Sequence, residues 1–469
     1  MQLGDILDDL SLDVATSSVE ITRVENDSRA CAPGTLFFAM PGAKGHGSNF
    51  ARDAVARGAS CVVSDTRVKV PVPVVVVPSS QLNALLAHAS ATIVGHPESR
   101  VKLVGVTGTN GKTSVSTIVA SLARALSWNA ASIGTLTNER TTPAAPELFR
   151  CLAHEVAAFD PDRKDSLVAL EVSSHALDQR RVEGLRFCVA AFTNLSHDHL
   201  DYHGTMESYF AAKASLFSTE YAKRAVIWVD DEYGARLAES TSLPVTRVTR
   251  ADARDVVNSL QGSTFLWRGH LVNSALAGDY NVDNALMAMA ILSTLGASDH
   301  DVAAAMSAVE GVAGRFDVLH GAGVTVVVDY AHTPRGLERL LRDVRALQGG
   351  GRLITVFGAG GDRDRAKRPE MGRVAAELSD VVVVTSDNPR SESPDLIIDA
   401  VMAGVPSSAD VRRVSDRREA IATALNEAGA NDVVVLAGKG HESTITVGDD
   451  VVPFSDRLVA QELLRGASC

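Results

Sequence analysis

Short apolar runs alternate with longer helical patterns along the whole chain. The short runs are rich in valine and isoleucine, and in the longer stretches alanine and leucine recur at helical spacing. Uniformly apolar short runs are typical of strands that are buried on both faces of a parallel sheet covered by helices. The pattern therefore predicts an α/β fold with parallel sheets. The predicted strands cover residues 61–63, 74–77, 102–106, 167–170, 324–328, 353–357, 381–384 and 433–436, and a helix is predicted over 82–94.

Two breaks in this pattern predict three domains. Residues 95–97 (Gly-His-Pro) follow the first helix, and a glycine-rich segment at 311–315 forms the second break. We expect a smaller N-terminal α/β domain over residues 1–98, a central domain over 99–315 and a C-terminal domain over 316–469. In the last of these, each strand is followed by a polar or glycine-rich loop and then a helix. This order predicts a Rossmann-like, doubly wound sheet with ligands at the carboxyl ends of its strands.

Composition and charge exclude several classes of function. The 469 residues include 57 acidic and 45 basic ones, which gives a formal net charge of −12, and lysine and arginine form no block. The chain therefore lacks the electrostatic footprint of a protein that binds nucleic acid or an anionic membrane. Its first residues lack a basic region followed by an apolar stretch, so we expect no signal peptide, and no apolar run reaches membrane length. We expect a cytoplasmic monomer with no nucleic-acid partner and no membrane insertion. The cysteines are scattered singly along the chain, which is typical of a protein in a reducing compartment. They are Cys31, Cys61, Cys151, Cys188 and Cys469.

A glycine-rich turn follows the predicted strand 102–106. Its sequence over residues 107–113 is Thr-Gly-Thr-Asn-Gly-Lys-Thr, and a helical segment comes next, so backbone N–H groups, a helix N-terminus and a lysine meet at one point. Such a turn cradles a polyphosphate, with Lys112 neutralising the outer phosphates and the Thr113 hydroxyl ligating Mg²⁺. The common Walker pattern has glycine where this chain has Val106. The turn predicts a central domain that resembles P-loop ATPases.

A cluster of histidines and carboxylates supplies candidate metal ligands. Residues 197–203 read His-Asp-His-Leu-Asp-Tyr-His. One interpretation is a zinc hydrolase built on His197, His199 and His203, in which the metal activates a water. Tyr202 stands where that pattern requires a histidine.

The other interpretation of this cluster is a Mg²⁺ site that serves the nucleotide. One histidine would then act with a carboxylate from Glu171, which ends the predicted strand 167–170. The nearby phosphate loop favours Mg²⁺, because this ion prefers carboxylate, hydroxyl and phosphate oxygens.

Seven motifs occur in order along the chain: 107–113, 171–175 (Glu-Val-Ser-Ser-His), 193–199 (Thr-Asn-Leu-Ser-His-Asp-His), 278–281 (Gly-Asp-Tyr-Asn), 314–316 (Gly-Arg-Phe), 329–332 (Asp-Tyr-Ala-His) and 387–390 (Asp-Asn-Pro-Arg). This set resembles the motifs of the Mur ligases, and the resemblance covers essentially the whole chain. It implies an ATP-dependent, ADP-forming ligase of peptidoglycan precursor synthesis. Such an enzyme joins an amino acid to the D-glutamate γ-carboxylate of UDP-N-acetylmuramoyl-L-alanyl-D-glutamate through an acyl phosphate.

The resemblance also implies two Mg²⁺ ions beside ATP. One would lie near Thr113 and Glu171, and the other near His199 and Lys213. Catalysis would depend on Lys112, Glu171, His199 and Lys213. In the family the lysine matching Lys213 is carboxylated, which turns a cation into an anionic oxygen ligand. The sequence alone places Lys213 in an alanine-rich helical segment, where an exposed surface lysine is the alternative.

The contacts of both nucleotides follow from the resemblance. Arg315, Asp329 and His332 look like the residues that close over ATP, and Asn281 and Asn284 resemble the family's adenine contacts. The ATP set is Gly108, Thr109, Asn110, Gly111, Lys112, Thr113, Asn281, Asn284, Arg315, Asp329 and His332. The loops 26–29 and 44–47 resemble the family's uridine-diphosphate loops, and the set for the UDP-muramoyl dipeptide is Ser28, His46, Thr141, Thr142, Ser173, Gln179 and Arg181.

The incoming amino acid is predicted from the motif after the strand 381–384. Arg390 offers a planar fork that suits a carboxylate. The side chain of meso-diaminopimelate ends in an ammonium and a carboxylate, whereas that of L-lysine ends in an ammonium, which an arginine repels. We therefore expect meso-diaminopimelate, with L-lysine or another diamino acid as the alternative and a surface salt bridge as the structural alternative for Arg390. By resemblance to the family, the predicted contacts of meso-diaminopimelate are Arg363, Asp387, Asn388, Arg390, Gly438 and Glu442. Glu442 would pair with the distal ammonium.

Three hypotheses about function remain after this reading. The first is the ligase with Mg²⁺ and ATP as described. The second is a metallohydrolase on the His197, His199 and His203 cluster, and the third is a nucleotide-switched scaffold that carries out no ligation.

Overall fold

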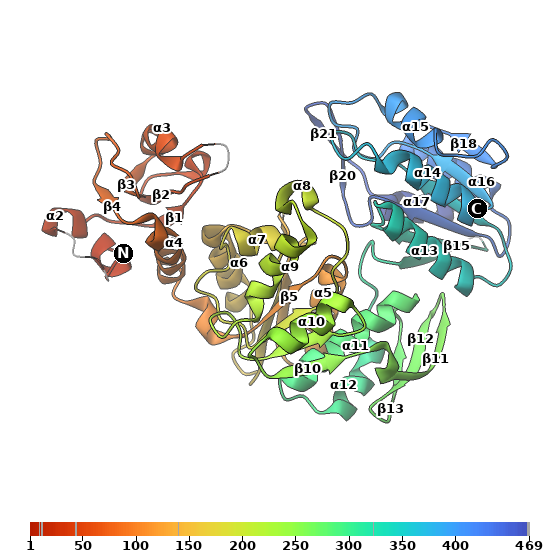
Figure 1. The fold of residues 1–469 in the computed structure, drawn as a ribbon, viewed down its shortest axis with the longest axis horizontal. Helices are drawn as coiled ribbons and strands as arrows, with labels where there is room; N and C mark the ends of the chain where they lie inside the picture. Colours follow the sequence, from red (N-terminus) through yellow and green to blue (C-terminus); the bar gives the residue numbers. More distant parts are fainter. Residues whose placement is uncertain (9, 11–12, 43–44, 139, 322, 467–469) are drawn as a thin grey trace. The chain divides into compact units, whose positions relative to one another are not determined.

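The chain packs as two compact units, each with an α/β fold (Figure 1). The computed structural model describes residues 1–8, 10, 13–42, 45–138, 140–321 and 323–466. The first unit contains residues 1–249 and 287–298, and the second contains 250–286 and 299–469. Within the described ranges, none of the helices is long and apolar enough to cross a membrane.

The first unit begins with a small parallel sheet. Its four strands lie in chain order, and β1 pairs with β2, β2 with β3 and β3 with β4. The buried side chains of β2 and β3 lie on both faces of this sheet, as uniformly apolar strands require. The predicted helix over 82–94 is confirmed for residues 82–93, which belong to α4. The elements are α1 (Leu3–Ile6), α2 (Val14–Ser17), β1 (Arg23–Glu25), β2 (Thr35–Ala39), α3 (Ala51–Ala56), β3 (Ala59–Ser64), β4 (Val74–Val76) and α4 (Ser79–Ile93).

A six-stranded parallel sheet follows in the same unit. Its strand order is β10-β9-β8-β5-β7-β6. Short helices and loops connect the strands, and α5 begins directly after the glycine-rich turn. The elements are β5 (Lys102–Thr107), α5 (Lys112–Ala125), β6 (Asn129–Ile133), α6 (Ala145–Ala157), β7 (Ser166–Glu171), α7 (Ser174–Asp178), β8 (Val189–Phe192), α8 (Leu200–His203), α9 (Met206–Ala214), β9 (Ala225–Trp228), α10 (Glu232–Ser240) and β10 (Val245–Val248).

The strand order of this sheet reverses at β5. The chain passes from β5 to β6 and β7 on one side and then returns to β8 on the other side, so that β5 pairs with both β7 and β8. In the register, Val106 lies opposite Glu171 and Thr107 lies opposite Phe192. A reversal of this kind opens a crevice at the carboxyl ends of the strands, where ligands bind in open α/β sheets. The glycine-rich turn therefore lies at the edge where such sheets bind ligands.

The second unit contains a six-stranded sheet with the order β14-β15-β19-β16-β17-β18. All its pairs are parallel except β14 with β15. The elements are β14 (Asp317–Gly321), β15 (Val324–Asp329), α13 (Pro334–Leu347), β16 (Leu353–Phe357), α14 (Lys367–Leu378), β17 (Val381–Val384), α15 (Pro394–Met402), β18 (Val411–Arg413), α16 (Arg417–Glu427), β19 (Val433–Ala437) and α17 (Asp456–Gly466).

Helices cover both faces of this sheet. Val433 and Val435 pack in one core with residues of α13, α14 and α15, whereas Val434 and Leu436 pack in another core with residues of α16 and α17. Side chains alternate across a strand, so a strand buried on both faces must be apolar at every position. The doubly wound sheet predicted from these uninterrupted runs is confirmed.

Antiparallel pieces were not anticipated from the sequence. A three-stranded antiparallel sheet in the second unit is formed by β11 (Ala253–Ser259), β12 (Gly262–Trp267) and β13 (His270–Ser274), before α11 (Asp279–Thr294) and α12 (Asp299–Ala305). A hairpin is formed by β20 (Thr444–Val447) and β21 (Asp450–Pro453). These strands mix polar and apolar residues, and β21 is exposed throughout whereas β12 is mostly buried. Their sequence therefore lacks the apolar runs on which the prediction depended.

A glycine beside the central sheet gives a test of this packing. A Cβ atom at Gly134 would lie 2.1 Å from Glu171 Oε1, so Gly134→Ala must displace a buried carboxylate. We expect the melting temperature, measured by circular dichroism, to fall by about 2–10 °C. The control is Gly349→Ala, because nothing lies within 4 Å of a Cβ atom built at that position. Equal melting temperatures for the two variants would contradict the described packing.

Candidate functional site

The glycine-rich turn after β5 has the geometry of a phosphate cradle. Gly108 has φ +149°, and a Cβ atom there would lie 1.9 Å from Thr193 Oγ1, so only glycine fits. Gly111 has φ +83° and precedes α5. Lys112 is the first residue of that helix, and its ammonium donates to the carbonyl oxygens of Gly108 at 3.0 Å and Thr109 at 2.9 Å. The lysine therefore lies against the loop that it would serve.

The end of β8 holds this loop in place. Thr193 Oγ1 donates to the carbonyl of Asn110 at 2.6 Å, and the N–H of Asn110 donates to Asn194 Oδ1 at 3.0 Å. The N–H of Thr109 donates to the carbonyl of Asn194 at 2.9 Å. The loop conformation is thus fixed by protein contacts. Asn194 was part of a recognised motif but had no predicted role.

A buried carboxylate at the end of β7 reaches the start of α5. The Thr113 hydroxyl donates to Glu171 Oε2 at 2.9 Å, and Glu171 is only 2% exposed. The N–H and hydroxyl of Thr135 donate to the same carboxylate at 2.8 and 3.2 Å. The Thr135 hydroxyl also lies 3.1 Å from that of Thr141. Sequence reasoning missed Thr135, although its position just past β6, at the carboxyl edge of the sheet, was a usable signal.

Four residues predicted for the dipeptide lie together beside this carboxylate. The Thr142 hydroxyl donates to the carbonyl of Glu171 at 2.8 Å and accepts from the N–H of Ser173 at 3.0 Å. Arg181 donates to the carbonyl of Thr142 at 2.8 Å and to Gln179 Oε1 at 2.7 Å. The structure therefore brings Thr142, Ser173, Gln179 and Arg181 into one network.

Lys213 is buried, so the alternative of an exposed surface lysine is wrong. Its side chain is 1% exposed, and Nζ donates to the carbonyl of Gly108 at 2.7 Å. Nζ also lies 4.7 Å from the ring centre of Tyr209, whose hydroxyl is 3.2 Å from Thr109 Oγ1. Burial, with the like charge of Lys112 adding to it, holds the pKa of Lys213 well below its usual value. Burial at this position therefore penalises the charged ammonium relative to the neutral amine.

The histidines gather near this lysine without forming a zinc site. The rings of His175 and His199 have centres 5.0 Å apart, and His203 Nε2 lies 2.9 Å from Ser174 Oγ. Burial and neighbouring histidines lower the pKa of His175 to about 4. Across the described ranges, no group of three or more His, Cys, Asp and Glu side chains could hold a metal ion. This result does not favour the zinc interpretation built on three histidines, because structural and catalytic zinc ions take at least three protein ligands.

The oxygen ligands beside the phosphate loop fit Mg²⁺ better. One hydroxyl and one carboxylate, Thr113 and Glu171, already lie within hydrogen-bonding distance of each other. Mg²⁺ keeps several water and phosphate ligands and needs only one or two from the protein.

Ser28 and His46, predicted for the uridine diphosphate, follow β1 and β2. These strands are parallel neighbours, so both residues lie at the same edge of the small sheet. His46 Nε2 lies 2.9 Å from Asp65 Oδ1, and its Nδ1 accepts from the N–H of Ser48 at 3.1 Å. Lys44, from the same loop, and Cys469 lie outside the described residues.

Asn281, Asn284 and Arg315 belong to the second unit. Asn281 Nδ2 donates to the carbonyl of Ala277 at 2.7 Å, and Asn284 Nδ2 donates to Asn281 Oδ1 at 3.1 Å. The Arg315 guanidinium lies over the ring of Tyr330, 4.4 Å from its centre. Asn281 and Arg315 line a cavity of about 230 Å³.

Asp329 lies at the carboxyl end of β15 and makes its hydrogen bonds within the protein. Its Oδ2 accepts from the N–H of Phe316 at 2.8 Å and from the hydroxyl of Tyr280 at 2.9 Å, and its Oδ1 accepts from the N–H of Ala331 at 2.8 Å. Asp329 therefore holds the segment that follows Arg315. His332 Nδ1 lies 2.8 Å from a backbone carbonyl two residues earlier in the chain.

The residues predicted for the amino acid come from loops that follow neighbouring strands. Asp387 and Asn388 follow β17, and Gly438 and Glu442 follow β19. Asn388 Nδ2 donates to Glu442 Oε2 at 2.8 Å, and the buried Lys439 ammonium donates to the same oxygen at 2.9 Å. Gly438 has φ +112°, and a Cβ atom there would lie 2.8 Å from Asp387 Oδ2. Sequence reasoning missed Lys439, although it lies between the predicted contacts Gly438 and Glu442.

Arg390 is held in an unusual backbone conformation by the hairpin β20–β21. It has φ +52°, its N–H donates to the carbonyl of Thr446 at 3.0 Å, and its Nη1 donates to the carbonyl of Gly361 at 2.7 Å. In the part of the chain that the structure describes, Arg390 forms no ion pair within 4.0 Å. The surface salt bridge considered for it is therefore wrong. Arg363 lies on the neighbouring loop, after β16.

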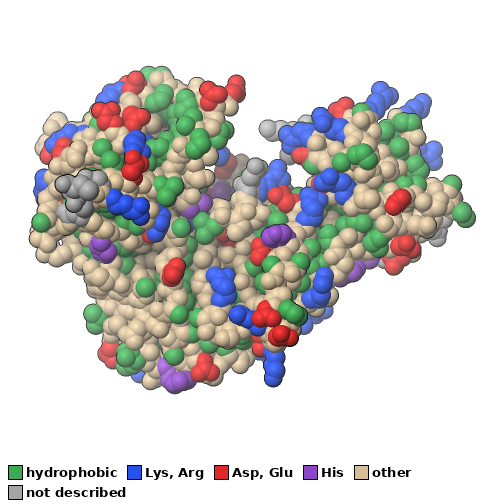
Figure 2. Space-filling model, turned by 180° about the vertical axis from the view of Figure 1, so that it is seen from behind, with side chains coloured by type: hydrophobic (Ala, Val, Ile, Leu, Met, Phe, Trp, Pro, Cys, Tyr) green, Lys and Arg blue, Asp and Glu red, His purple; other side chains and the backbone are tan. Residues whose placement is uncertain are grey.

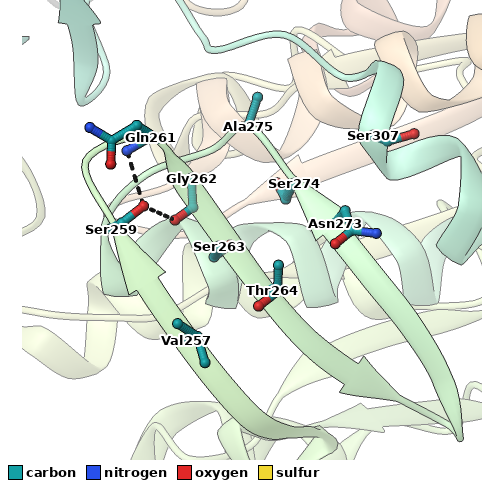
Figure 3. A pocket seen from close by; sticks show the side chains of 10 residues that line it. All are labelled: Val257, Ser259, Gln261, Gly262, Ser263, Thr264, Asn273, Ser274, Ala275 and Ser307. Carbon is teal, nitrogen blue, oxygen red and sulfur yellow. Dashed lines mark hydrogen bonds between the residues drawn. The ribbon is translucent and has the colours of Figure 1, made fainter.

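None of the predicted site residues lines a second cavity. It has a volume of about 330 Å³ and is lined by the antiparallel strands β11–β13 together with Ser307 (Figure 3). Ser259 accepts from the N–H of Gln261 and donates to the carbonyl of Gly262, both at 3.2 Å. Its lining side chains carry no charge. On the face in Figure 2, acidic and basic side chains are mixed, as in the sequence.

Comparisons with known proteins agree with this geometry. Three family models match the chain: "Mur ligase family, catalytic domain" over residues 20–108, "Mur ligase middle domain" over 106–292 and "Mur ligase, glutamate ligase domain" over 314–440. A protein of Gloeobacter violaceus named UDP-N-acetylmuramoyl-L-alanyl-D-glutamate--2,6-diaminopimelate ligase is 42% identical, covering 99% of this chain and 98% of that protein. A protein of the same name from Geobacillus kaustophilus is also 42% identical, covering 95% of each chain.

Solved structures show the same fold. A structure of a ligase with that name superposes with a TM-score of 0.70 at 30% identity, covering 100% of this chain and 99% of the other. The ligase MurF of Thermotoga maritima, solved with ADP, superposes with a TM-score of 0.62 at 17% identity, covering 95% of this chain and 96% of that chain. At this identity, the similarity shows only a shared fold. With family models, near-complete relatives and fold in agreement, the chain belongs to the Mur ligase family.

Proposed function

We propose that this protein adds meso-diaminopimelate to the D-glutamate γ-carboxylate of UDP-N-acetylmuramoyl-L-alanyl-D-glutamate, with ATP converted to ADP and phosphate. The observation that carries the proposal is the 42% identity, over 99% of the chain, to a ligase named for this reaction. The phosphate loop with its buried Thr113–Glu171 contact supports the use of ATP. The alternative of a scaffold that carries out no ligation has no observation in its favour.

The chemistry proceeds in two steps. A carboxylate is a poor electrophile, so the γ-phosphoryl group of ATP first moves onto the substrate carboxylate and ADP leaves. The amine of the second substrate then attacks the acyl carbon, phosphate leaves, and the amine loses its proton. Phosphoryl transfer brings anionic groups together, and cations placed where charge accumulates lower this barrier. Lys112, held against the phosphate loop, is the residue that fits this role.

Magnesium completes the proposed site. Thr113 and Glu171 would hold one ion, and His199 and Lys213 would lie near the other. When bound, the ions would neutralise phosphate charge. The chain's own contribution is to keep the Glu171 carboxylate fixed by three hydrogen bonds.

Carboxylation of Lys213 fits its surroundings. A neutral amine attacks CO₂ to form a carbamate and releases a proton, and burial favours the neutral amine at this position. The carbamate would replace a buried amine by anionic oxygens, which bind metal ions.

The domain and location predictions remain proposals. We propose a UDP-sugar-binding domain over 1–98, an ATP-binding domain over 99–315 and an amino-acid-binding domain over 316–469. Matches of separate family models to residues 20–108, 106–292 and 314–440 support this division. We also propose a monomer that acts on small molecules in the cytoplasm, a location that the use of ATP supports.

The amino-acid specificity can be tested by ADP release. In a coupled assay with ATP, Mg²⁺ and the UDP-muramoyl dipeptide, we expect ADP to form rapidly with meso-diaminopimelate and slowly with L-lysine, because Arg390 would repel the lysine ammonium. Reactions without the dipeptide or without an amino acid are the controls. Slow ADP formation that occurs without either acceptor and does not rise when both are added would favour the scaffold hypothesis. Preference for L-lysine would reject the choice of substrate.

The role of Arg390 predicts a selective kinetic defect. Arg390→Ala removes a charged hydrogen bond to the substrate carboxylate, a loss of about 1.5–3 kcal/mol, so KM for meso-diaminopimelate should rise about ten- to hundredfold. KM for ATP should change less than about twofold. The matched control is Arg373→Ala, which removes an exposed arginine paired with Glu377 on α14. A parallel rise in both constants would show that Arg390 is not a selective contact.

The proposed carboxylation of Lys213 can be tested by nuclear magnetic resonance. Protein equilibrated with ¹³C-bicarbonate should give a carbamate carbon signal, and Lys213→Ala should lack it. A signal that persists in the variant, or no signal in the parent protein, would contradict the proposal.

A further inference from the structure

A buried ion pair lies beneath the two loops that carry the proposed amino-acid site. Arg417 is the first residue of α16, and Asp456 is the first residue of α17. Arg417 donates from Nε to Asp456 Oδ1 at 2.7 Å and from Nη2 to Asp456 Oδ2 at 2.6 Å. Both side chains are 0% exposed. The pair joins the two helices that cover one face of the sheet.

The same guanidinium also holds two backbone carbonyls. Its Nη1 donates to the carbonyl of Ser386 at 3.1 Å, and its Nη2 donates to the carbonyl of Ala437 at 3.0 Å. Ser386 directly precedes Asp387, and Ala437 is the last residue of β19, directly before Gly438. One rigid, planar group therefore sets the distance between two chain segments at the points where they enter the proposed site.

Stability alone does not account for this arginine. A cation at the start of a helix faces the positive end of the helix dipole, which is unfavourable. A fully buried ion pair also loses the hydration of both charges, and replacement by apolar residues is often neutral or stabilising. Residues that are unfavourable for local stability in this way are often retained because they contribute to function.

Above the pair, the two loops meet again in close contact. A Cβ atom at Gly438 would lie 2.8 Å from Asp387 Oδ2, so a small change in loop spacing would produce a collision or a gap. Further out, Asn388 donates to Glu442 at 2.8 Å. Asp387, Asn388, Gly438 and Glu442 therefore depend on the spacing that Arg417 sets.

We infer that Arg417, fixed by Asp456, is a positioning residue for the amino-acid substrate. It touches no substrate itself, and it acts through the carbonyls of Ser386 and Ala437. The inference rests on the proposed function. Because Asp456 belongs to α17, the C-terminal helix would contribute to the affinity for the amino acid.

The test replaces both charges at once. Removing one partner would leave the other charge buried and unpaired, so single truncations would destabilise the fold. The double variant Arg417→Met, Asp456→Leu keeps volume and apolar packing. We expect its melting temperature to stay close to that of the parent and its KM for meso-diaminopimelate to rise about tenfold or more. KM values for ATP and for the UDP-muramoyl dipeptide should stay within about twofold.

A second variant keeps the inference testable if the double variant does not fold. Arg417→Lys retains the charge and the pairing with Asp456, but an ammonium lacks the planar fork that reaches both carbonyls. We expect a smaller rise in KM for meso-diaminopimelate with the other two constants unchanged. The matched control is Arg418→Met, Glu462→Leu, an exposed ion pair between the same two helices, which should leave all three constants unchanged.

The outcomes separate the inference from the proposed function. If the parent protein forms no ADP with any amino acid, the proposed function fails. If the parent is active and the folded variants show an unchanged KM for meso-diaminopimelate, or an equal rise in all three constants, the positioning role of Arg417 is overturned.

Discussion

The buried Glu171 carboxylate constrains the whole ATP side of this protein. A carboxylate removed from water needs hydrogen-bond donors, and Glu171 receives them from Thr113 and from two groups of Thr135. These donors come from the start of α5 and from the segment after β6. They can converge only because β5, β6 and β7 are parallel and end at one edge, with Val106 opposite Glu171 in the register. The reversal of strand order at β5 then brings Thr193 and Asn194 to the other side of the same loop.

The second unit follows the same rule with different chemistry. The central strands β15, β16, β17 and β19 of its sheet are largely apolar, and polar residues are concentrated where these strands end. Asp329 is the last residue of β15. Arg363, Asn388 and Glu442 lie in the loops that follow β16, β17 and β19, respectively. Buried charge at this edge is balanced by close partners, such as Lys439 with Glu442 and Arg417 with Asp456. The uncharged cavity on β11–β13 lacks such groups, and we assign it no role.

Much of this architecture could be predicted from the sequence, for a physical reason. Strands such as β17 and β19 are buried on both faces, so burial acts on every residue and leaves an uninterrupted apolar run. The strands β11–β13 mix polar and apolar residues and leave no such run, so they escaped prediction. Recognition of the phosphate loop depended on glycines that the geometry requires, as Gly108 shows.

Contacts between distant segments could not be predicted in the same way. Thr135 and Glu171 are 36 residues apart in sequence, and Arg417 and Asp456 are 39 residues apart. Their meeting depends on strand order and helix packing, which no local pattern encodes. The burial of Lys213 is a similar case: its alanine-rich helix suggested exposure, and only the contact with the Gly108 carbonyl reversed that interpretation.

The central claim is that the protein makes a carboxylate reactive by transferring a phosphoryl group to it. The most direct measurement uses the UDP-muramoyl dipeptide with ¹⁸O in the D-glutamate γ-carboxylate, followed by mass spectrometry of the phosphate released during ligation. Transfer through an acyl phosphate predicts that the released phosphate carries ¹⁸O in proportion to the peptide formed. Peptide formation accompanied by unlabelled phosphate would contradict the account.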